Sequence, residues 1–262
     1  MPVARSTDPE IQILEIKEGR LTLTVKGTTP LILNRMSEKA RHELLLPKGR
    51  KTAADKASSL KHNPLEEFRA SPYTLREDTA PTLIALTAVT FKAAMGTAAL
   101  DLPGARKSEI GRLVFVMGDY IPIYGEPQLL MSVVRSADMN RTPDIRTRCI
   151  VPNWTAELTI TYNQIKLREV AVGNLLAAAG ITAGVGDWRP EKGKGAYGKF
   201  DVVSKDDPEV LQLKKLWGRE QQKKAMLNPV AYDIETEDLF EWFKSEAPVR
   251  GFKVVDTEEA AG

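Results

Sequence analysis

The sequence is poor in the residues that build metal centres and nucleophilic active sites. Its 262 residues include one cysteine, Cys149, and two histidines, His42 and His62. A single cysteine cannot form an internal disulfide, and this set matches neither a zinc finger nor the HExxH pattern of metalloproteases. We interpret both histidines as surface residues and Cys149 as a buried one. The sequence therefore predicts no metal site and no cofactor.

Long apolar runs are also missing. No stretch approaches the roughly 18 uninterrupted apolar residues of a membrane-spanning helix, and the start, MPVARSTDPE, lacks the apolar core of a signal peptide. We therefore expect a cytoplasmic protein without membrane contact. A composition of 42% hydrophobic and 27% charged residues is ordinary for a globular protein, and the length suits one elaborate domain or two small ones.

The motifs of common enzymes are absent as well. The sequence contains no GxSxG elbow and no Walker A motif, and the carboxylates Asp144 and Glu157 lack the nearby lysine of a metal-dependent nuclease. We therefore predict a protein without catalytic activity. The alternative is a metal-independent endoribonuclease that uses His42 or His62 as acid and base, helped by Asp138 or Asp144.

Charge is distributed unevenly along the chain. The net charge is +2, but residues 226–262 carry −6 and the preceding residues therefore carry +8. Eight bases and three acids lie between Arg35 and His62. A basic body with an acidic tail indicates a polyanion partner, with the tail as competitor or as handle for another protein. The alternative is a solvated surface that binds nothing.

Periodicity predicts a mixed order of strands and helices. Expected strands are 20–27, 31–33, 82–89, 113–117, 120–124, 129–134, 156–162 and 199–203. Expected helices are 37–46, with Ser37 as N-cap, then 91–100, 167–179, 208–227 and 237–246. This order predicts an α+β fold with a ferredoxin-like (RNA-recognition-like) core.

Several segments are predicted to elaborate this core. They are an N-terminal arm (1–19), the core itself (20–204), a basic helix and insertion (35–64), a thumb-like β-hairpin insertion (135–154), a glycine-rich loop (180–200) and a helical, acidic C-terminal extension (205–262). In the hairpin, strands 129–134 and 156–162 are joined by a long polar connection that contains Arg135, Arg141, Arg146 and Arg148.

The glycine-rich loop offers binding chemistry. Its six glycines let main-chain N–H groups approach a phosphate chain, Arg189, Lys192, Lys194 and Lys199 add positive charge, and Trp188 and Tyr197 can stack on bases. The alternative is a purely structural loop, in which Trp188 plugs the core and Arg189 pairs with Asp187.

Three segments together resemble the RAMP superfamily, which includes backbone subunits and guide-processing nucleases of CRISPR systems. They are Leu21–Leu33, the small-residue helix 91–100, and GKGAYGKF at Gly193–Phe200. The chain also resembles an uncharacterised type of protein carried by phages and prophages. The RAMP resemblance implies a core that binds single-stranded nucleic acid, a hairpin thumb over the strand and protomers stacked head to tail. The acidic tail is not a feature of that family.

The expected function is therefore sequence-independent binding of single-stranded RNA or DNA by a homo-oligomer or filament. The resemblance and the charges together give the candidate nucleic-acid-binding residues Arg35, Lys39, Arg41, Arg135, Arg141, Arg146, Arg148, Trp188, Arg189, Lys192, Lys194, Tyr197 and Lys199. The sequence does not distinguish two biological roles for such a protein, a subunit that coats guide RNA and a phage protein that coats single strands. A further alternative is a protein–protein module that mimics a CRISPR subunit and docks through EDLFEWF in the tail, 226–262.

Overall fold

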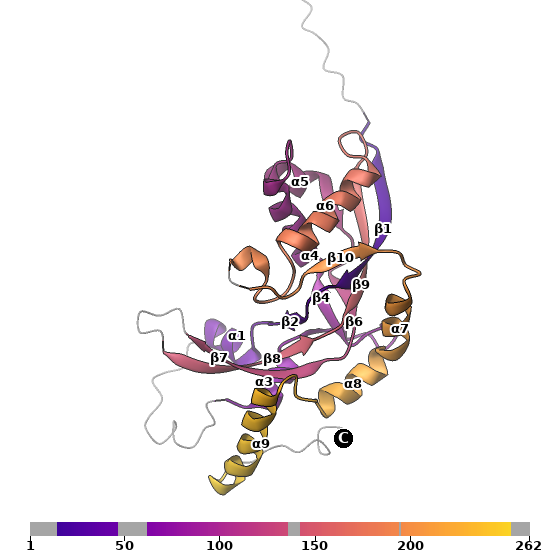
Figure 1. The fold of residues 1–262 in the computed structure, drawn as a ribbon. Coiled ribbons are helices and arrows are strands. Elements are labelled where there is room, and N and C mark those ends of the chain that lie inside the picture. The colour runs from indigo at the N-terminus through magenta and orange to yellow at the C-terminus, as the bar shows by residue number, and fades with distance from the viewer. Residues whose placement is uncertain (1–14, 47–61, 136–141, 194, 253–262) are drawn as a thin grey trace, which may run out of the picture.

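The computed structural model describes residues 15–46, 62–135, 142–193 and 195–252. Its centre is a ferredoxin-like unit, two strand–helix–strand halves that share one antiparallel sheet. In chain order the unit comprises β1 (Glu18–Gly27), α4 (Ala88–Ala98), the broken strand β5 (Val114–Val116) and β6 (Tyr120–Tyr124), β9 (Thr155–Asn163), α6 (Glu169–Thr182) and β10 (Phe200–Val203). The strand order is β10-β1-β9-β6, and β5 also pairs with β9 (Figure 1). The predicted fold class is confirmed.

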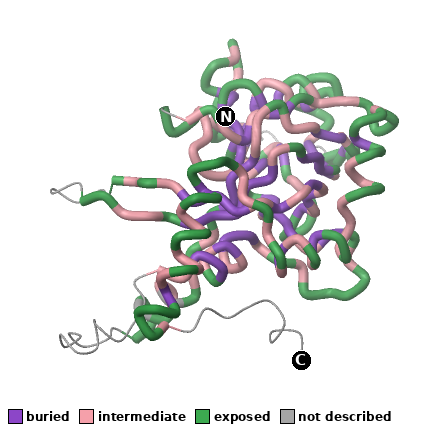
Figure 2. Tube along the Cα trace, turned by 60° about the horizontal axis from the view of Figure 1, so that its bottom comes forward, coloured by how far each residue is buried: buried purple, intermediate pink, exposed green. Residues whose placement is uncertain are grey.

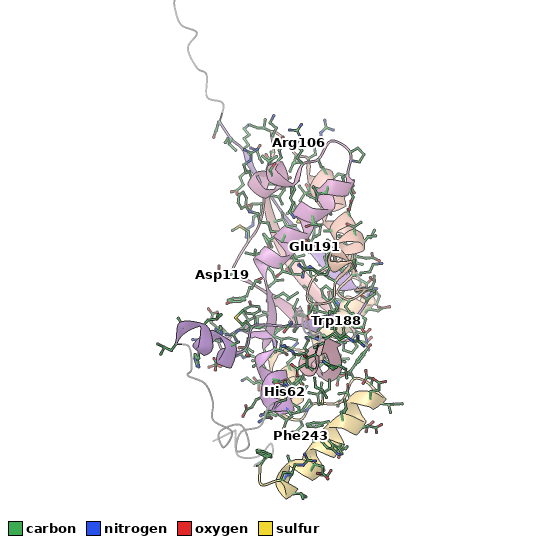
Figure 3. All side chains as sticks on the ribbon, turned by 90° about the vertical axis from the view of Figure 1, so that its left-hand side faces the viewer. His62, Arg106, Asp119, Trp188, Glu191 and Phe243 are labelled. Atoms are coloured by element: carbon green, nitrogen blue, oxygen red, sulfur yellow. The ribbon has the colours of Figure 1, made fainter. Side chains whose placement is uncertain are left out.

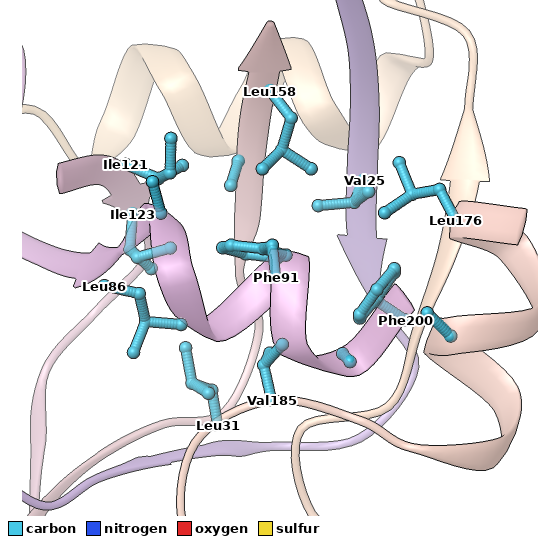
Figure 4. Close-up of a cluster of buried hydrophobic side chains, with 14 of the residues drawn as sticks. Val25, Leu31, Leu86, Phe91, Ile121, Ile123, Leu158, Leu176, Val185 and Phe200 are labelled. Carbon is cyan, nitrogen blue, oxygen red and sulfur yellow. The ribbon is translucent and has the colours of Figure 1, made fainter. Parts of the chain in front are cut away.

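One face of this sheet is covered by α4 and α6, which pack against each other. Alternating apolar residues of β1, including Leu21 and Val25, point into this layer and are buried. Phe91 of α4 is fully buried there, with its ring centroid 5.9 Å from that of Phe200 on β10. Figure 4 shows both rings among the aliphatic side chains of the sheet. This contact fixes the start of α4 against the end of the glycine-rich loop.

The sheet continues beyond β6 with β4 (Ile84–Thr87) and the short β3 (Tyr73–Thr74). β4 leads directly into α4, so the predicted strand 82–89 and helix 91–100 meet at Ala88. The connection from α4 to β5 contains a 3-10 turn, η1 (Ala99–Asp101), and the helix α5 (Lys107–Leu113).

The predicted hairpin was wrong in its second strand. β7 (Gln128–Arg135) pairs with β8 (Pro143–Val151), and residues 156–162 belong to β9 in the main sheet. The base of β8, from Thr147 to Val151, is buried as a continuous run, so it lacks the alternation that marks a half-exposed strand. The hairpin therefore spans 128–151, in place of a thumb at 135–154. Its base is buried and its far end projects from the body (Figure 2).

The insertion after β1 supplies three further elements. β2 (Leu31–Leu33) pairs with β8 and makes a second, three-stranded sheet. α1 (Glu38–Leu45) begins after Ser37, whose Oγ accepts a hydrogen bond from the Ala40 N–H, as predicted. The sequence prediction missed α3 (Pro64–Ala70), which starts at a proline after an Asn63 N-cap. Residues 47–61 of the predicted basic insertion lie outside the described ranges.

The C-terminal extension folds back onto both sheets. The predicted helix 208–227 is two helices, α7 (Pro208–Leu216) and α8 (Arg219–Leu227), and α9 (Ile234–Val249) is longer than the predicted 237–246. Beside β7, the Leu129 N–H donates to the Val230 carbonyl and the Tyr232 N–H donates to that of Leu129, both at 2.8 Å. The extension thereby covers the free edge of the hairpin base. Among the described helices, none has the length and apolar character needed to cross a membrane.

Candidate nucleic-acid interface

The glycine-rich loop is packed tightly against itself. A Cβ at Gly195 would lie 1.5 Å from the Trp188 carbonyl oxygen, and one at Gly198 would lie 1.7 Å from that of Val185. Only glycine permits such approaches, and Gly198 also has a positive φ of +69°. These glycines are therefore explained by packing.

The main-chain donors of the loop are mostly used within the protein. The N–H groups of Gly184, Val185, Asp187, Glu191, Tyr197 and Gly198 donate to main-chain carbonyl oxygens. The predicted nest of N–H groups is largely occupied in this way. Contacts from the loop to a phosphate chain must therefore come mainly from side chains.

Trp188 and Tyr197 stand together on the second sheet. Their ring centroids lie 6.0 Å apart, and both pack against a cluster of Ile32, Leu130 and Ile150. Trp188 has a φ of +50°, a conformation that a bulky residue adopts only when its surroundings hold it there. Both rings are half-buried and keep an exposed part, as base stacking requires.

Arg148 connects the loop to the hairpin. Its Nε lies 3.2 Å from Asp187 Oδ2, which also accepts a hydrogen bond from Asn34 Nδ2 at 2.9 Å. Its guanidinium carbon lies 5.0 Å from the Trp188 ring centroid, and its side chain is only 9% exposed. Burial lowers the pKa of Arg148, against the opposing effect of Asp187. The position is inside the protein, so Arg148 is a poor candidate for the predicted phosphate contact and instead positions Trp188.

A cavity of about 360 Å³ opens beside this contact. It is lined by the end of β2 and the start of the next connection (Leu33, Asn34), by Ser71 and Tyr73, by α4 and its N-cap (Thr87, Val89, Thr90, Ala93, Ala94) and by the loop (Gly186, Asp187, Arg189, Glu191). The first turn of α4 contains no acidic residue. The positive end of the helix dipole therefore favours an anion here. The amide of Asn34 and the hydroxyl groups of Ser71, Thr87 and Thr90 can form hydrogen bonds with the edge of a nucleic-acid base.

Arg189 forms an ion pair with Glu191. The hypothesis of a purely structural loop predicted Asp187 as its partner. The Arg189 Nε lies 2.7 Å from Glu191 Oε2, and its Nη1 donates to the Gly186 carbonyl at 2.9 Å. Burial raises the pKa of Glu191, but hydrogen bonds from Arg189 and Thr97 and the charge of Lys192 outweigh it, so the pKa lies below its ordinary value. The Arg189 charge is thus largely neutralised within the loop.

Other predicted cations are available for a ligand. Arg35, Arg135, Lys192 and Lys199 make no ion pair within the described part of the chain, and Arg146 is 55% exposed at 3.6 Å from Asp144. The Arg35 guanidinium carbon lies 5.4 Å from the centroid of the Tyr73 ring, which lines the cavity. Arg41 pairs with Glu38 on α1 at 3.5 Å. Lys39 is also on α1, while Arg141 and Lys194 fall outside the described residues.

The two histidines differ in their surroundings. His62 lies between two carboxylates, with Nδ1 2.8 Å from Glu67 Oε1 and Nε2 3.0 Å from Asp144 Oδ1. Both ring nitrogens are engaged, so His62 joins α3 to β8 and has no free nitrogen for a substrate. His42 is exposed on α1 and is the histidine left to the endoribonuclease hypothesis.

Cys149 is fully buried, and burial raises the pKa of its thiol far above the usual range, which excludes a reactive thiolate. No cluster of three or more metal-ligating side chains exists among the residues with described positions.

Sequence reasoning missed Asn34, Tyr73, Asp187 and Glu191 as parts of the site. Their roles depend on the pairing of β2 with β8 and on the path of the loop across it, which no short motif encodes. Figure 3 shows Trp188 and Glu191 on the same side of the molecule, above His62. The contacts of Arg148 with Asp187 and Trp188, and of Asn34 with Asp187, bring the hairpin, the loop and the connection after β2 together at one face.

No protein-family model and no curated protein matches the sequence. Among solved structures, the chain is similar to the crystal structure of Cmr6 from Pyrococcus furiosus, with 10% sequence identity and a TM-score of 0.34. This similarity covers 72% of the present chain and 100% of the other. The ferredoxin-like assignment rests on the strand order described above.

Proposed function

We propose that the protein is a non-enzymatic, RAMP-like binder of single-stranded nucleic acid. The strand would cross the face between the glycine-rich loop and the β7–β8 hairpin. The observation that carries the proposal is the cavity beside Asp187, which meets the first turn of α4 and lies next to Arg35, a cation without an ion pair in the described part of the chain. A cavity of about 360 Å³ has room for one flipped-out base, which a single strand can supply without unpairing.

The charges support contact with phosphates more than with bases. Arg35 lies next to the cavity, Lys192 lies on the loop, and Arg135 and Arg146 lie on the projecting part of the hairpin. These cations come from three separate segments, so a strand that touches them all must run across the face. Trp188 and Tyr197 would add sequence-tolerant stacking.

The resemblance of residues 21–33, 91–100 and 193–200 to the RAMP superfamily agrees with this proposal. It also leads us to include self-association along the strand. The two settings, a guide-RNA-coating subunit and a phage single-strand coat, share this binding chemistry.

The test is fluorescence anisotropy with labelled single-stranded RNA, single-stranded DNA and duplex at several salt concentrations. We expect single strands to bind best, and the logarithm of the affinity to fall linearly with the logarithm of salt concentration. The double variant Arg135→Glu/Lys192→Glu should bind about tenfold or more weakly. In a plot of the logarithm of affinity against the logarithm of salt concentration, the slope should also become shallower by about one for each phosphate that the variant no longer neutralises.

The matched control is Lys205→Glu, an equally exposed charge in the connection between β10 and α7, on the other side of the molecule (Figure 1). It should leave the affinity nearly unchanged. A salt-independent affinity, or equal losses in both variants, would contradict the proposal. Light scattering with RNase or DNase then tests self-association, because a filament should collapse when its strand is digested.

A further inference from the structure

A second pocket lies at the end of the molecule that is remote from the hairpin. It has a volume of about 400 Å³ and is formed by the connection after η1, by α5 and by the residues just before α6. Its lining includes the charged residues Arg106, Arg112, Lys166 and Glu109, and the buried or half-buried aliphatic residues Ile110, Leu113 and Leu167. Figure 3 shows Arg106 at the opposite end from His62 and Phe243. The pocket is therefore separate from the loop and hairpin face.

The three cations of this pocket face solvent and are not paired with acidic side chains in the described structure. Arg106, Arg112 and Lys166 are all exposed, and within the described ranges none makes an ion pair. With Glu109, these three cations give the pocket lining a net charge of +2, which favours an anionic ligand. Two guanidinium groups and an ammonium suit phosphate oxygens, because an arginine can donate two parallel hydrogen bonds to one phosphate.

The remaining lining residues indicate a ligand that has an apolar ring and hydrogen-bond donors in addition to an anionic group. Ile110 is buried, and Leu113 and Leu167 are half-buried, so the base of the pocket offers aliphatic surface to a flat ring. Glu109 is a hydrogen-bond acceptor in an otherwise positive site and makes no ion pair in the described structure. A carboxylate in such a place can accept hydrogen bonds from ribose hydroxyl groups or from the exocyclic amino group of a base.

We propose that this pocket binds a nucleoside monophosphate. The phosphate would contact Arg106, Arg112 and Lys166, the base would lie on the aliphatic floor, and Glu109 would accept from the sugar or the base. The ligand can be a free nucleotide or the 5′-phosphorylated terminal residue of a strand, which share this chemistry. The inference does not depend on the proposed function, because a mononucleotide needs no contact with the hairpin.

The test is isothermal titration calorimetry with adenosine monophosphate, adenosine and inorganic phosphate as probes. Adenosine monophosphate should bind at one site, and both fragments should bind about tenfold or more weakly. Arg106→Glu/Arg112→Glu should weaken this binding at least about tenfold, as should Lys166→Glu. Lys205→Glu should not change it. Circular dichroism checks that each variant is folded, and these residues are exposed enough to replace without disturbing the core.

Oligonucleotides with and without a 5′-phosphate separate the two sources of ligand. A preference for the phosphorylated strand that disappears in Arg106→Glu/Arg112→Glu identifies the strand end, and equal binding of both identifies the free nucleotide. The inference is overturned if adenosine monophosphate does not bind, if inorganic phosphate binds equally well, or if the pocket variants bind as the wild type does. Arg135→Glu/Lys192→Glu should retain mononucleotide binding, so failure of the proposed function and failure of this inference are distinguishable.

Discussion

At the scale of single residues, Gln222 shows how a polar side chain can organise a fold. It is fully buried on α8. Its Oε1 accepts from the N–H groups of Leu83 and Ile84, and its Nε2 donates to the carbonyl oxygens of Ile123 and Gly125 at 2.9 and 3.0 Å. One amide thus satisfies four main-chain groups at the start of β4 and the end of β6. It thereby ties β4, the strand from which α4 begins, to β6.

Gln222→Ala should therefore lower the free energy of unfolding by roughly 2–4 kcal/mol, because it leaves several buried main-chain groups without partners. Urea denaturation measures the change. The control is Gln221→Ala, at the exposed neighbouring position, which should change the stability by less than about 0.5 kcal/mol. Equal effects of the two variants would mean that the four hydrogen bonds contribute nothing.

At the scale of elements, α6 carries two glycines with opposite surroundings. A Cβ at Gly180 would lie 1.9 Å from the Phe200 carbonyl oxygen, whereas a Cβ at Gly173 has nothing within 4 Å. Gly180 therefore permits the close approach of α6 to β10, at the two ends of the glycine-rich loop. Gly173 lies inside the helix and lacks any such reason.

The two alanine variants of α6 should move stability in opposite directions. Gly173→Ala should raise the free energy of unfolding by about 0.5–1 kcal/mol, since alanine favours the helix. Gly180→Ala should lower it by roughly 3 kcal/mol by forcing β10 away. Thermal and urea unfolding distinguish the two. A neutral Gly180→Ala would show that α6 and β10 can separate without cost.

At the scale of the whole molecule, opposite charges lie on two sides of the hairpin. The acidic residues of α9, among them Glu237, Asp238 and Glu241, are exposed, and α9 packs against β7. Figure 1 shows α9 on one side of the hairpin and the glycine-rich loop on the other. The helix starts near the candidate face, since Tyr232 packs on the same apolar cluster as Trp188 and Tyr197, and then extends away from that face, so its charges act on a bound strand mainly through space.

Neutralising Glu237, Asp238 and Glu241 together, to Gln, Asn and Gln, should have a salt-dependent effect on binding of single strands. We expect severalfold tighter binding near 0.01 M salt, where the Debye length is about 30 Å, and less than about twofold change at 0.15 M, where it is about 8 Å. Anisotropy titrations at both concentrations test this. An equally large effect at 0.15 M would mean that the acidic segment competes directly for the strand.

The sequence alone was enough to predict the ferredoxin-like class and the placement of most elements. Their signals are local. The alternation in β1, the Ser37 cap and the apolar runs at β5 and β6 can be recognised without knowing which strands or helices they pack against. The binding face depended on tertiary structure. Arg146 and Arg148 lie on the same face of β8, but the glycine-rich loop packs only on the hairpin base, so Arg148 is buried while Arg146 is exposed. Contacts between distant segments also paired Asp187 with Arg148 and Asn34, and gathered Arg106, Arg112 and Lys166 at one pocket. Such choices depend on which chain segments meet, and local periodicity carries no information about that.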